Sequence, residues 1–480
     1  MHEHPVIDCL TLEDAMLALS MVGDLSMGQP LDQSRRTARL ARQLAQACAG
    51  DGEHLRVADQ VALLRWSGCT ANAEGFTRLL GDDVSGRQAM LSQTLGPAGQ
   101  RALRKTSPLA RVHCEVAGEV ASALGLTVPV EQGLRNVFEH FDGSGRPYGL
   151  SHPEIPEVVY QVVLAGDLEI LSRAHGVEAA LAWIAGQADR RYPATLVAEL
   201  TRHAEDWLAL LQAPSAPVAG LGGEADVQLT LVANVIDLKL SWLAGYSRAS
   251  ADLVRAAANL MGLPMAAQAR LGKAALVHGV GRAAVPNRVW NTPGALLDGD
   301  RDQIHLVPWW TQRACAQVPG LADVAQLAAH AYERLDGSGY FRGLGAESLQ
   351  PEQRLLAVAL AWEALRAERP WRPAFSAQEA AKVLLGEAAN GRLDAQCCEA
   401  VIAAARGERQ WAGRGGSGLL SERESEVLRL ISLGNSNKET ARLLGISPST
   451  VRTHVESTFR KLECTTRAAA TLKALTLGLL

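Results

Sequence analysis

The sequence predicts an all-α protein, and three observations support that fold class. Apolar residues recur at intervals of three and four in long segments such as RRTARLARQLAQACAG, ADLVRAAANLMGL and QRLLAVALAWEALRAE. The alternation of apolar and polar residues that is typical of strands is nearly absent. Phe and Tyr, which favour sheets, number only 6 each in the whole chain. We therefore expect helices throughout and no large β-sheet.

The length of 480 residues exceeds what one hydrophobic core usually organises, and it indicates about three domains. Two stretches rich in Gly, Pro and Ala predict linkers, namely APSAPVAGLGGEA at 213–225 and GERQWAGRGGSG at 407–418. The predicted domains accordingly span residues 1–213, 225–406 and 418–480.

The composition is that of a soluble globular protein, with 48% hydrophobic and 20% charged residues. The N-terminal segment has no basic stretch followed by an apolar run, and no apolar stretch is long enough to cross a bilayer. These patterns predict a cytoplasmic protein without a membrane partner. The 8 cysteines are scattered without C-x-x-C spacing, so we expect free thiols rather than disulfides or a zinc site.

The first two predicted domains contain an internal repeat. FEHFDGSGRPYGL at 138–150 matches YERLDGSGYFRGL at 332–344, and both share the frame E-x-x-D-G-S-G. The aspartate can accept hydrogen bonds from the backbone that follows it, and glycine permits a positive φ, so each copy predicts a tight turn. Helical segments precede both copies in the same order, which indicates that one structural unit occurs twice.

The last sixty residues carry clear helix-start signals. An S-x-x-E capping box begins at Ser421 and another at Ser436, in which the hydroxyl and the carboxylate satisfy free N–H groups of a first helical turn. A third start is Ser447, which a proline follows. Gly445 predicts a tight turn between the second and third of these helices.

The third helix of this region is amphipathic. Its predicted buried stripe contains Val451, Val455, Phe459 and Leu462, and its open face carries Ser449, Arg452, Thr453, Glu456 and Arg460. Residues 420–480 hold nine Lys and Arg against six Glu, a net charge of +3, whereas the whole chain has −4. The positive charge is thus concentrated where such a helix can enter the major groove of double-stranded DNA.

The stretch LSERESEVLRLISLGNSNKETARLLGISPSTVRTHVESTFRKL resembles the helix-turn-helix domain of LuxR-type regulators over nearly its full length. The resemblance implies double-stranded DNA as the partner, and it implies DNA-binding roles for Asn437, Lys438, Ser449, Thr450, Arg452, Thr453, His454 and Lys461. Glu456 is acidic where some relatives have a basic contact, which leaves the base preference open. The alternative reading is a plain four-helix tail with solvated charges.

The repeated landmarks of residues 20–405 resemble, twice, those of HD-GYP domains, which are helical metal-dependent phosphodiesterases that hydrolyse cyclic di-GMP. In that family seven His and Asp positions hold the metal ions. In the second repeat these positions are Tyr246, His278, Gly279, Val307, Ala331, Tyr332 and Leu360. In the first repeat they are Gln33, Ser67, Gly68, His113, Val137, Phe138 and Gly166.

A divalent metal needs at least three or four converging ligands, and neither repeat supplies them. We therefore expect no metal, no other cofactor, no catalytic residue and no enzymatic activity. His113 and His278 are expected to be hydrogen-bonded core residues. The substitutions leave open whether each former metal cleft is packed shut or forms an apolar pocket.

The leading hypothesis is a sequence-specific transcription regulator in which two catalytically inactive HD-GYP-like domains sense a ligand or a partner and control dimerisation. We expect a homodimer, a small-molecule effector of unknown identity, and weak self-pairing by the last helix through Ala468, Ala469, Leu472, Leu475 and Leu477. One alternative is a residual phosphohydrolase or cyclic-dinucleotide phosphodiesterase fused to a DNA-binding domain. Another is a cyclic-dinucleotide receptor without turnover, with contacts from Trp309, Trp310, Tyr332, Tyr340 and Arg342.

Overall fold

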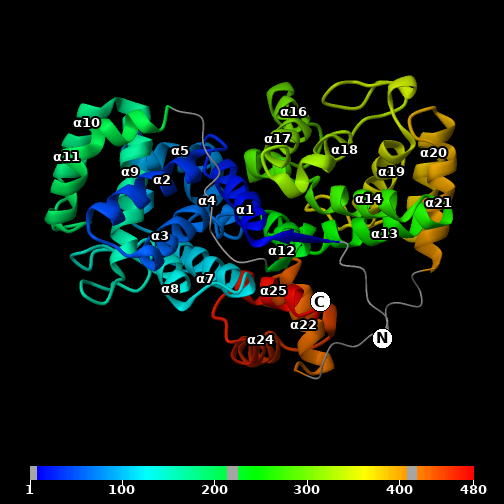
Figure 1. Cartoon of the computed structure of the whole chain (residues 1–480). Helices are drawn as coiled ribbons and strands as arrows, with labels where there is room; N and C mark the ends of the chain where they lie inside the picture. The colour runs from blue at the N-terminus through cyan, green and yellow to red at the C-terminus, as the bar shows by residue number, and fades with distance from the viewer. Residues whose placement is uncertain (1–7, 213–224, 408–418) are drawn as a thin grey trace. The chain divides into compact units, whose positions relative to one another are not determined.

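The computed structural model describes residues 8–212, 225–407 and 419–480. The chain forms two compact units. The N-terminal unit is Thr11–Ala225, and the C-terminal unit combines Asp226–Leu480 with Met1–Leu10. Both units consist of helices (Figure 1), so the all-α prediction is confirmed. Both predicted linkers, 213–225 and 407–418, lie outside the described residues except at 225 and 407. The division into three domains stays a prediction.

The N-terminal unit contains eleven described helices. They are α1 (Leu12–Ser26), α2 (Gln33–Ala47), α3 (Gly52–Leu64), α4 (Ala73–Leu80), α5 (Asp83–Leu91), α6 (Pro97–Leu103), α7 (Ser107–Ala123), α8 (Val128–Arg135), α9 (Glu157–His175), α10 (Val177–Ala185) and α11 (Ala194–Leu210). Side chains fix several helix starts, since Thr11 Oγ1 accepts the Asp14 N–H at 3.1 Å and Asp51 accepts that of His54 at 2.8 Å. The central helix α2 packs against α3 and α9.

The C-terminal unit begins with a small two-stranded sheet of β1 (Cys9–Thr11) and β2 (Asp226–Gln228). The helices that follow are α12 (Leu229–Asp237), α13 (Tyr246–Leu260), α14 (Met265–Val277), α15 (Asn287–Trp290), α16 (Asp298–His305), α17 (Val307–Cys315), α18 (Ala325–Ala329), α19 (Pro351–Arg366), α20 (Ala377–Ala389) and α21 (Ala395–Gly407). Short 3-10 helices lie at η1 (Ser241–Leu243), η2 (Val280–Ala284), η3 (Pro319–Val324) and η4 (Ala346–Ser348). Here α13 packs against α14, α19 and α21.

The internal repeat has the same hydrogen bonds in both copies. Glu139 accepts the N–H groups of Tyr148 at 2.7 Å and of Leu150 at 3.0 Å. In the second copy Glu333 accepts the two corresponding N–H groups, nine and eleven residues further on, at 2.9 Å each. A buried carboxylate therefore holds the loop in the same way in each copy. The sequence repeat is thus a structural repeat.

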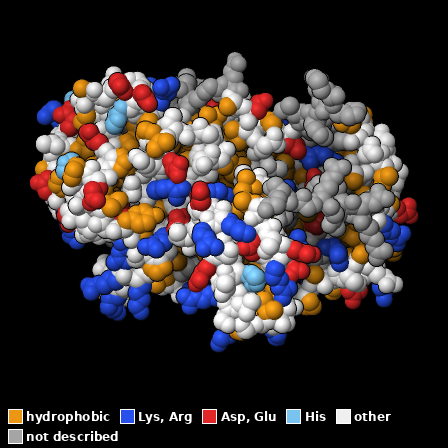
Figure 2. Space-filling view, turned by 90° about the horizontal axis from the view of Figure 1, so that it is seen from below, with side chains coloured by type: hydrophobic (Ala, Val, Ile, Leu, Met, Phe, Trp, Pro, Cys, Tyr) orange, Lys and Arg blue, Asp and Glu red, His pale blue; other side chains and the backbone are white. Residues whose placement is uncertain are grey.

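The last part of the C-terminal unit consists of α22 (Glu422–Ser432), α23 (Asn437–Leu444), α24 (Pro448–Leu462) and α25 (Arg467–Thr476). Across the described part of the chain no helix combines the length and the hydropathy that a membrane crossing requires. In Figure 2, Lys and Arg side chains are interspersed with Asp and Glu over the face shown. All eight cysteines lie in the described residues and are free, and Cys397 and Cys398 are buried.

Candidate functional site

The helices α22, α23 and the predicted DNA-contacting helix α24 each begin at one of the three caps predicted from the sequence. Ser421 and Ser436 each accept the N–H of the glutamate three residues later, and each glutamate accepts the serine N–H at 2.7 Å. Ser447 Oγ accepts the Thr450 N–H at 3.0 Å, which starts α24 directly after the turn at Gly445. Gly445 has φ of 65°, so a residue without a side chain suits the end of α23.

One face of α24 is buried and the other is open. Val451, Val455 and Leu462 are buried as the periodicity predicts. Phe459 is only partly buried, and the buried neighbour is Thr458, because the helix turns slightly further than a strict four-residue repeat. The open face carries Ser449, Thr450, Arg452 and Thr453 as exposed residues, with His454 half-buried beside them. This face has the short polar and basic character that base edges and phosphates accept.

The charged residues near this face are partly engaged with one another. Arg452 donates to Glu456 at 2.8 Å, four residues later on the same exposed face. Lys461 donates to Glu424 at 2.6 Å, and Glu424 also accepts a hydrogen bond from Ser457. Among the predicted contacts, Lys438 is exposed, whereas Lys461 has this intramolecular partner.

Asn437 is held by an interaction that the sequence analysis missed. The Asn437 Oδ1 accepts from Arg467 Nη2 at 2.6 Å, and Arg467 also donates to the Asn435 carbonyl at 2.9 Å. The arginine lies at the start of α25, thirty residues after Asn437, and no local pattern links the two. This contact ties α25 to the N-terminal end of α23, which is the end that lies next to a DNA backbone in a helix-turn-helix.

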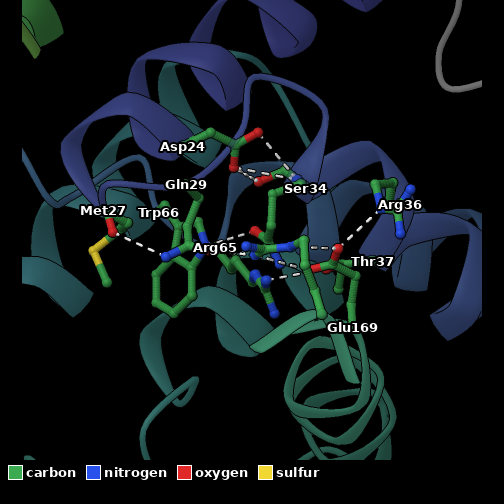
Figure 3. Close-up of polar contacts among 11 residues, drawn as sticks. Asp24, Met27, Gln29, Ser34, Arg36, Thr37, Arg65, Trp66 and Glu169 are labelled. Carbon is green, nitrogen blue, oxygen red and sulfur yellow. Dashed lines mark hydrogen bonds and ion pairs between the residues drawn. The ribbon is translucent and has the colours of Figure 1, made fainter. Parts of the chain in front are cut away.

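In the N-terminal unit, a buried arginine lies among the positions that the resemblance matches to metal ligands. Arg65 Nη2 donates to Thr37 Oγ1 at 3.0 Å, and its guanidinium lies 4.5 Å from the ring centroid of Trp66 (Figure 3). The guanidinium also occupies the space where a β-carbon of Gly166 would lie. Gly166 is the position that the resemblance matches to the last aspartate of the family. The arginine has therefore taken the space that this side chain would need.

Acidic groups surround Arg65 at the base of the cleft. Asp24 accepts the N–H and the hydroxyl of Ser34, the latter at 2.6 Å, and Glu169 pairs with Arg36 at 2.9 Å (Figure 3). Burial raises the pKa of Asp24 to about 7, against the opposing effects of the Ser34 hydrogen bonds and of Arg65. Burial also disfavours the charged form of Arg65, and this lowers the pKa of Arg65 to about 10.

His113, a former ligand position of the same cleft, is completely buried. Its Nε2 lies 2.8 Å from the Arg65 carbonyl oxygen, so the ring is hydrogen-bonded within the core. Burial is the main cause that lowers the pKa of His113 to about 3, which keeps the ring neutral at physiological pH.

The C-terminal unit has an arginine at the corresponding cleft, although it comes from a different sequence position. Arg282 Nη2 donates to His278 Nε2 at 2.6 Å and to the Tyr332 hydroxyl at 3.0 Å. Asp237 lies 3.9 Å away and accepts the Ser247 N–H and hydroxyl at 2.8 Å each, as Asp24 does for Ser34 in the first repeat. Both clefts thus contain a buried arginine beside an Asp–Ser pair.

This second cleft is a pocket and is not packed shut. Its volume is about 240 Å³, and five of the seven former ligand positions line it, namely Tyr246, Val307, Ala331, Tyr332 and Leu360. The rings of Tyr332 and Tyr340 stack at 5.2 Å, and three arginines also line the pocket, Arg282, Arg334 and Arg369. The pocket is therefore aromatic and cationic, which differs from both the closed cleft and the apolar pocket that the substituted ligand positions left open.

The further aromatic and arginine contacts that the sequence analysis named are only partly brought together. Tyr332 and Tyr340 line this pocket, but Trp309, Trp310 and Arg342 do not. The two tryptophans pack edge-on against each other at 4.5 Å, and Arg342 donates to Gln312 at 2.9 Å. Only the tyrosine pair is placed for ligand contact.

The residues at the two clefts do not fit a metal ion. No group of three or more His, Cys, Asp or Glu that could hold one occurs within 8–212, 225–407 and 419–480. Two histidines stand at positions that the resemblance matches to metal ligands. His113 is hydrogen-bonded to the backbone carbonyl of Arg65, and His278 to the guanidinium of Arg282.

Comparison with known families gives two matches. The family described as HD domain matches residues 230–397, and the bacterial regulatory proteins of the luxR family match residues 418–474. The resemblance of the C-terminal part to a LuxR-type domain and that of the preceding part to HD proteins are both confirmed. The LuxR-type part is also 49% identical to the transcriptional activator protein CarR of Pectobacterium carotovorum, over 13% of this chain and 25% of that protein.

The preceding part is similar to named phosphodiesterases. The 3'3'-cGAMP-specific phosphodiesterase 3 of Vibrio cholerae is 23% identical over 81% of this chain and 94% of its own length. The 3'3'-cGAMP-specific phosphodiesterase 1 of the same organism is 31% identical, and this chain spans only 40% of its length. A crystal structure of a cyclic GMP-AMP specific phosphodiesterase of V. cholerae has the same fold, with a TM-score of 0.58 and 21% identity over 83% of this chain and 98% of that chain.

These comparisons correct one expectation from the sequence. The missing metal ligands led to the prediction that the chain is not an enzyme. This prediction is wrong, because the named relatives and the structural neighbour are phosphodiesterases. Counting the residues of one family's metal site does not test other arrangements of the same fold.

Proposed function

Since the chain carries an HD domain followed by a LuxR-type DNA-binding domain, we propose that it is a sequence-specific transcription regulator whose HD-like part responds to a ligand or partner and controls DNA binding. The observation that carries this proposal is the open face of α24, where Thr450, Arg452 and Thr453 are exposed on a helix with a firmly buried opposite side. Such a helix fits the major groove, where Arg reaches guanine or phosphate and Thr contacts a thymine methyl group.

The proposed DNA-bound form is a homodimer, because one helix-turn-helix reads only a few base pairs. The surface expected for self-pairing on α25 is mostly covered, which corrects that expectation. Ala469, Leu472 and Leu475 are buried because α25 packs against α22, α24 and α12, and Leu477 remains exposed. The area for dimerisation therefore has to come from other surfaces of the chain, and the HD-like repeats are the proposed source.

The proposed response to a ligand uses the pocket at the second cleft. Tyr332 and Tyr340 offer stacked rings, and Arg282 provides a buried guanidinium beside them. Aromatic faces and arginine are suited to a small molecule with an aromatic ring and a negative charge. A ligand there would contact α13 and α19, which are central helices of the C-terminal unit.

The regulator proposal is tested by selecting bound sequences from random duplex DNA with the full chain. A Thr450→Ala/Arg452→Ala variant should lose the selected sequence preference, and Arg429→Ala, an exposed arginine on α22, serves as the matched charge control. If the double variant retains the wild-type preference, α24 is not the reading helix and the proposal fails.

The named relatives favour a second candidate, the hydrolysis of a cyclic dinucleotide. The supporting observation is the similarity over 81% of this chain to a V. cholerae phosphodiesterase. The test is incubation of the purified chain with 3'3'-cGAMP and with cyclic di-GMP in the presence of Mn²⁺, Mg²⁺ or Fe²⁺, followed by chromatography of the products. Linear product that disappears in a His278→Ala variant supports this activity, and intact nucleotide under every condition rejects it.

A further inference from the structure

A second pocket lies wholly within the N-terminal unit, and its lining is strongly basic. Its volume is about 500 Å³, which falls in the range of small-molecule sites. Five arginines and two histidines line it, and none of the described residues in its lining is Asp or Glu. The arginines come from four places, namely α5, the end of α6, the D-G-S-G loop and the segment after α10. An uncharged ligand would leave this concentration of positive charge uncompensated.

Among the described residues, three of the five arginines form no ion pair, although Arg190 interacts electrostatically with Asp142. Arg87 lies 3.9 Å from Asp83, and Arg191 lies 3.3 Å from Asp167, so these two are paired. The other three, Arg104, Arg146 and Arg190, form no ion pair in the described structure. Their guanidinium groups are therefore the source of the positive charge in the pocket.

The environment of His140 shows the same positive field. Burial is the main cause that lowers the pKa of His140 to about 4, and the nearby charges of Arg191, Arg190 and Arg146 lower it further, against the opposite effect of Asp142. Asp142 is exposed and accepts the Ser144 N–H at 2.8 Å, and it forms no ion pair with these arginines in the described structure. The ring of His140 therefore stays neutral at physiological pH, and the field comes from the arginines.

Two of the lining arginines also have a buried donor without a partner. The Nε of Arg87 and the Nε of Arg191 are buried and make no hydrogen bond. The side chain of Arg87 is 1% exposed, and its remaining nitrogens already donate to backbone and side-chain oxygens of the N-terminal unit. An unmade hydrogen bond at a buried charged group is costly, and two arginines of this pocket carry that cost.

Aromatic rings stand beside the charges. Phe76, Phe138 and Trp183 line the same pocket, and Arg191 lies 5.8 Å from the centroid of the Trp183 ring. Rings of this kind stack on nucleobases without strong preference for one base. The pocket thus offers a surface for an aromatic base together with a separate set of cations.

The corresponding loop of the second repeat differs at the decisive position. Arg146 follows D-G-S-G in the first repeat, where Tyr340 stands in the second. The loop pocket of the second repeat is about 240 Å³ and contains stacked tyrosines. The two repeats therefore present different chemistry to ligands, although they share a fold.

From these observations we propose that the N-terminal pocket binds a nucleoside di- or triphosphate. Such a ligand carries about three to four negative charges at neutral pH, which matches Arg104, Arg146 and Arg190, whereas a cyclic dinucleotide carries only about two. Guanidinium groups bind phosphate oxygens through paired, charge-assisted hydrogen bonds. The proposed regulator would thus have a second ligand-binding site. Ligand binding at this site does not require DNA.

The test is calorimetric titration of the full chain, without DNA, with ATP, GTP and GDP. An Arg104→Gln/Arg190→Gln variant removes two exposed cations whose side chains form no hydrogen bond or ion pair with other described residues, and Arg101→Gln, an exposed arginine of α6 outside the pocket, is the matched control. We expect the double variant to bind about tenfold or more weakly, and the control to bind as the wild type does. Binding should also weaken as salt concentration rises.

Further titrants decide the ligand class. Pyrophosphate and adenosine should each bind more weakly than ATP, because pyrophosphate lacks the aromatic base and adenosine lacks the phosphates. Equal affinity of the double variant and the wild type, no binding of any di- or triphosphate, or tighter binding of 3'3'-cGAMP than of ATP and GTP would each overturn the proposal. A loss of sequence-selective DNA binding would contradict the proposed regulator and leave this assay unaffected, so the two failures are distinguishable.

Discussion

The guanidinium of Arg65 occupies the space that a β-carbon at Gly166 would fill. Arg65 follows α3, and Gly166 belongs to α9, so this contact fixes how these two helices close the first cleft. The arrangement is stable only while residue 166 has no side chain, because both residues lie in the interior of the N-terminal unit.

Gly166→Ala should therefore destabilise the N-terminal unit, by about 1 to 3 kcal/mol, since the new methyl group has to displace a buried arginine. The matched control is Gly52→Ala in α3, where nothing lies within 4 Å of the added β-carbon. Hydrogen–deuterium exchange of peptides from α3 and α9 measures the effect. Unchanged protection in Gly166→Ala would show that Arg65 does not occupy this space.

Arg452→Ala should weaken binding to the selected DNA sequence by about 1 to 3 kcal/mol if the arginine reads a guanine, and by less if it contacts only phosphate. The side chain is exposed, and its hydrogen-bond partner among the described residues is the exposed Glu456, so its removal leaves none of these residues buried and unpaired. Gel-shift titration at fixed salt checks this. Equal affinities of the variant and the wild type would exclude Arg452 as a DNA contact.

Glu456→Gln should strengthen DNA binding to all sequences, because it removes a negative charge from the open face and releases Arg452 from its 2.8 Å partner. The expected gain is about 0.5 to 1 kcal/mol, the scale of an exposed ion pair. In a plot of log affinity against log salt concentration, the slope should become steeper by about the amount that one further phosphate contact contributes. Weaker binding by this variant would indicate that Glu456 itself accepts a hydrogen bond from a base.

Glu424 should make the DNA-binding helices sensitive to acid. Burial alone would raise its pKa, but the hydrogen bonds from Lys461, Ser421 and Ser457 outweigh that effect and lower the pKa to about 2. Since the folded-state pKa lies below the usual value near 4.3, the stabilisation is present above about pH 4.3 and is lost as pH falls towards 2.

Glu424→Gln should remove this dependence and lower the protection of α22 and α24 at neutral pH. Hydrogen–deuterium exchange of α22 and α24 peptides at several pH values, corrected for intrinsic rates, is the measurement. Glu422→Gln, an exposed residue of the same helix turn, is the control. The same pH dependence in Glu424→Gln and in wild type would assign the acid sensitivity to another group.

The parts of this structure that follow from neighbouring residues were predictable from the sequence. The caps at Ser421, Ser436 and Ser447 depend on residues three positions apart, and the loops held by Glu139 and Glu333 appear as a repeat in the letters themselves. Each is a local hydrogen-bond pattern, which needs no knowledge of the tertiary fold.

The arginines of the clefts could not be predicted in the same way. About a hundred residues separate Arg65 from Gly166, and Arg282 reaches His278 from the other side of the former ligand pair. Substituted ligand positions show what a site has lost, but they do not show which distant side chain enters the space. The basic pocket of the N-terminal unit is likewise assembled from helices and a loop that only the fold brings together.

The last helix, α25, shows what an apolar pattern in the sequence does not predict. Ala469 and Leu472 have the spacing of an exposed pairing surface, yet both are buried within the C-terminal unit. Periodicity identifies the apolar face of a helix, but only the fold shows whether the same chain already covers it.

Selection of random duplex DNA by the full-length protein, followed by sedimentation of the resulting complex, tests whether the chain reads DNA through α24. We predict one enriched sequence with two half-sites about one helical turn apart, bound by two copies of the chain. The preference should be lost in Thr450→Ala/Arg452→Ala and kept in Arg429→Ala. No enriched sequence, or the same enrichment in the double variant, would contradict a transcription regulator that reads DNA through α24.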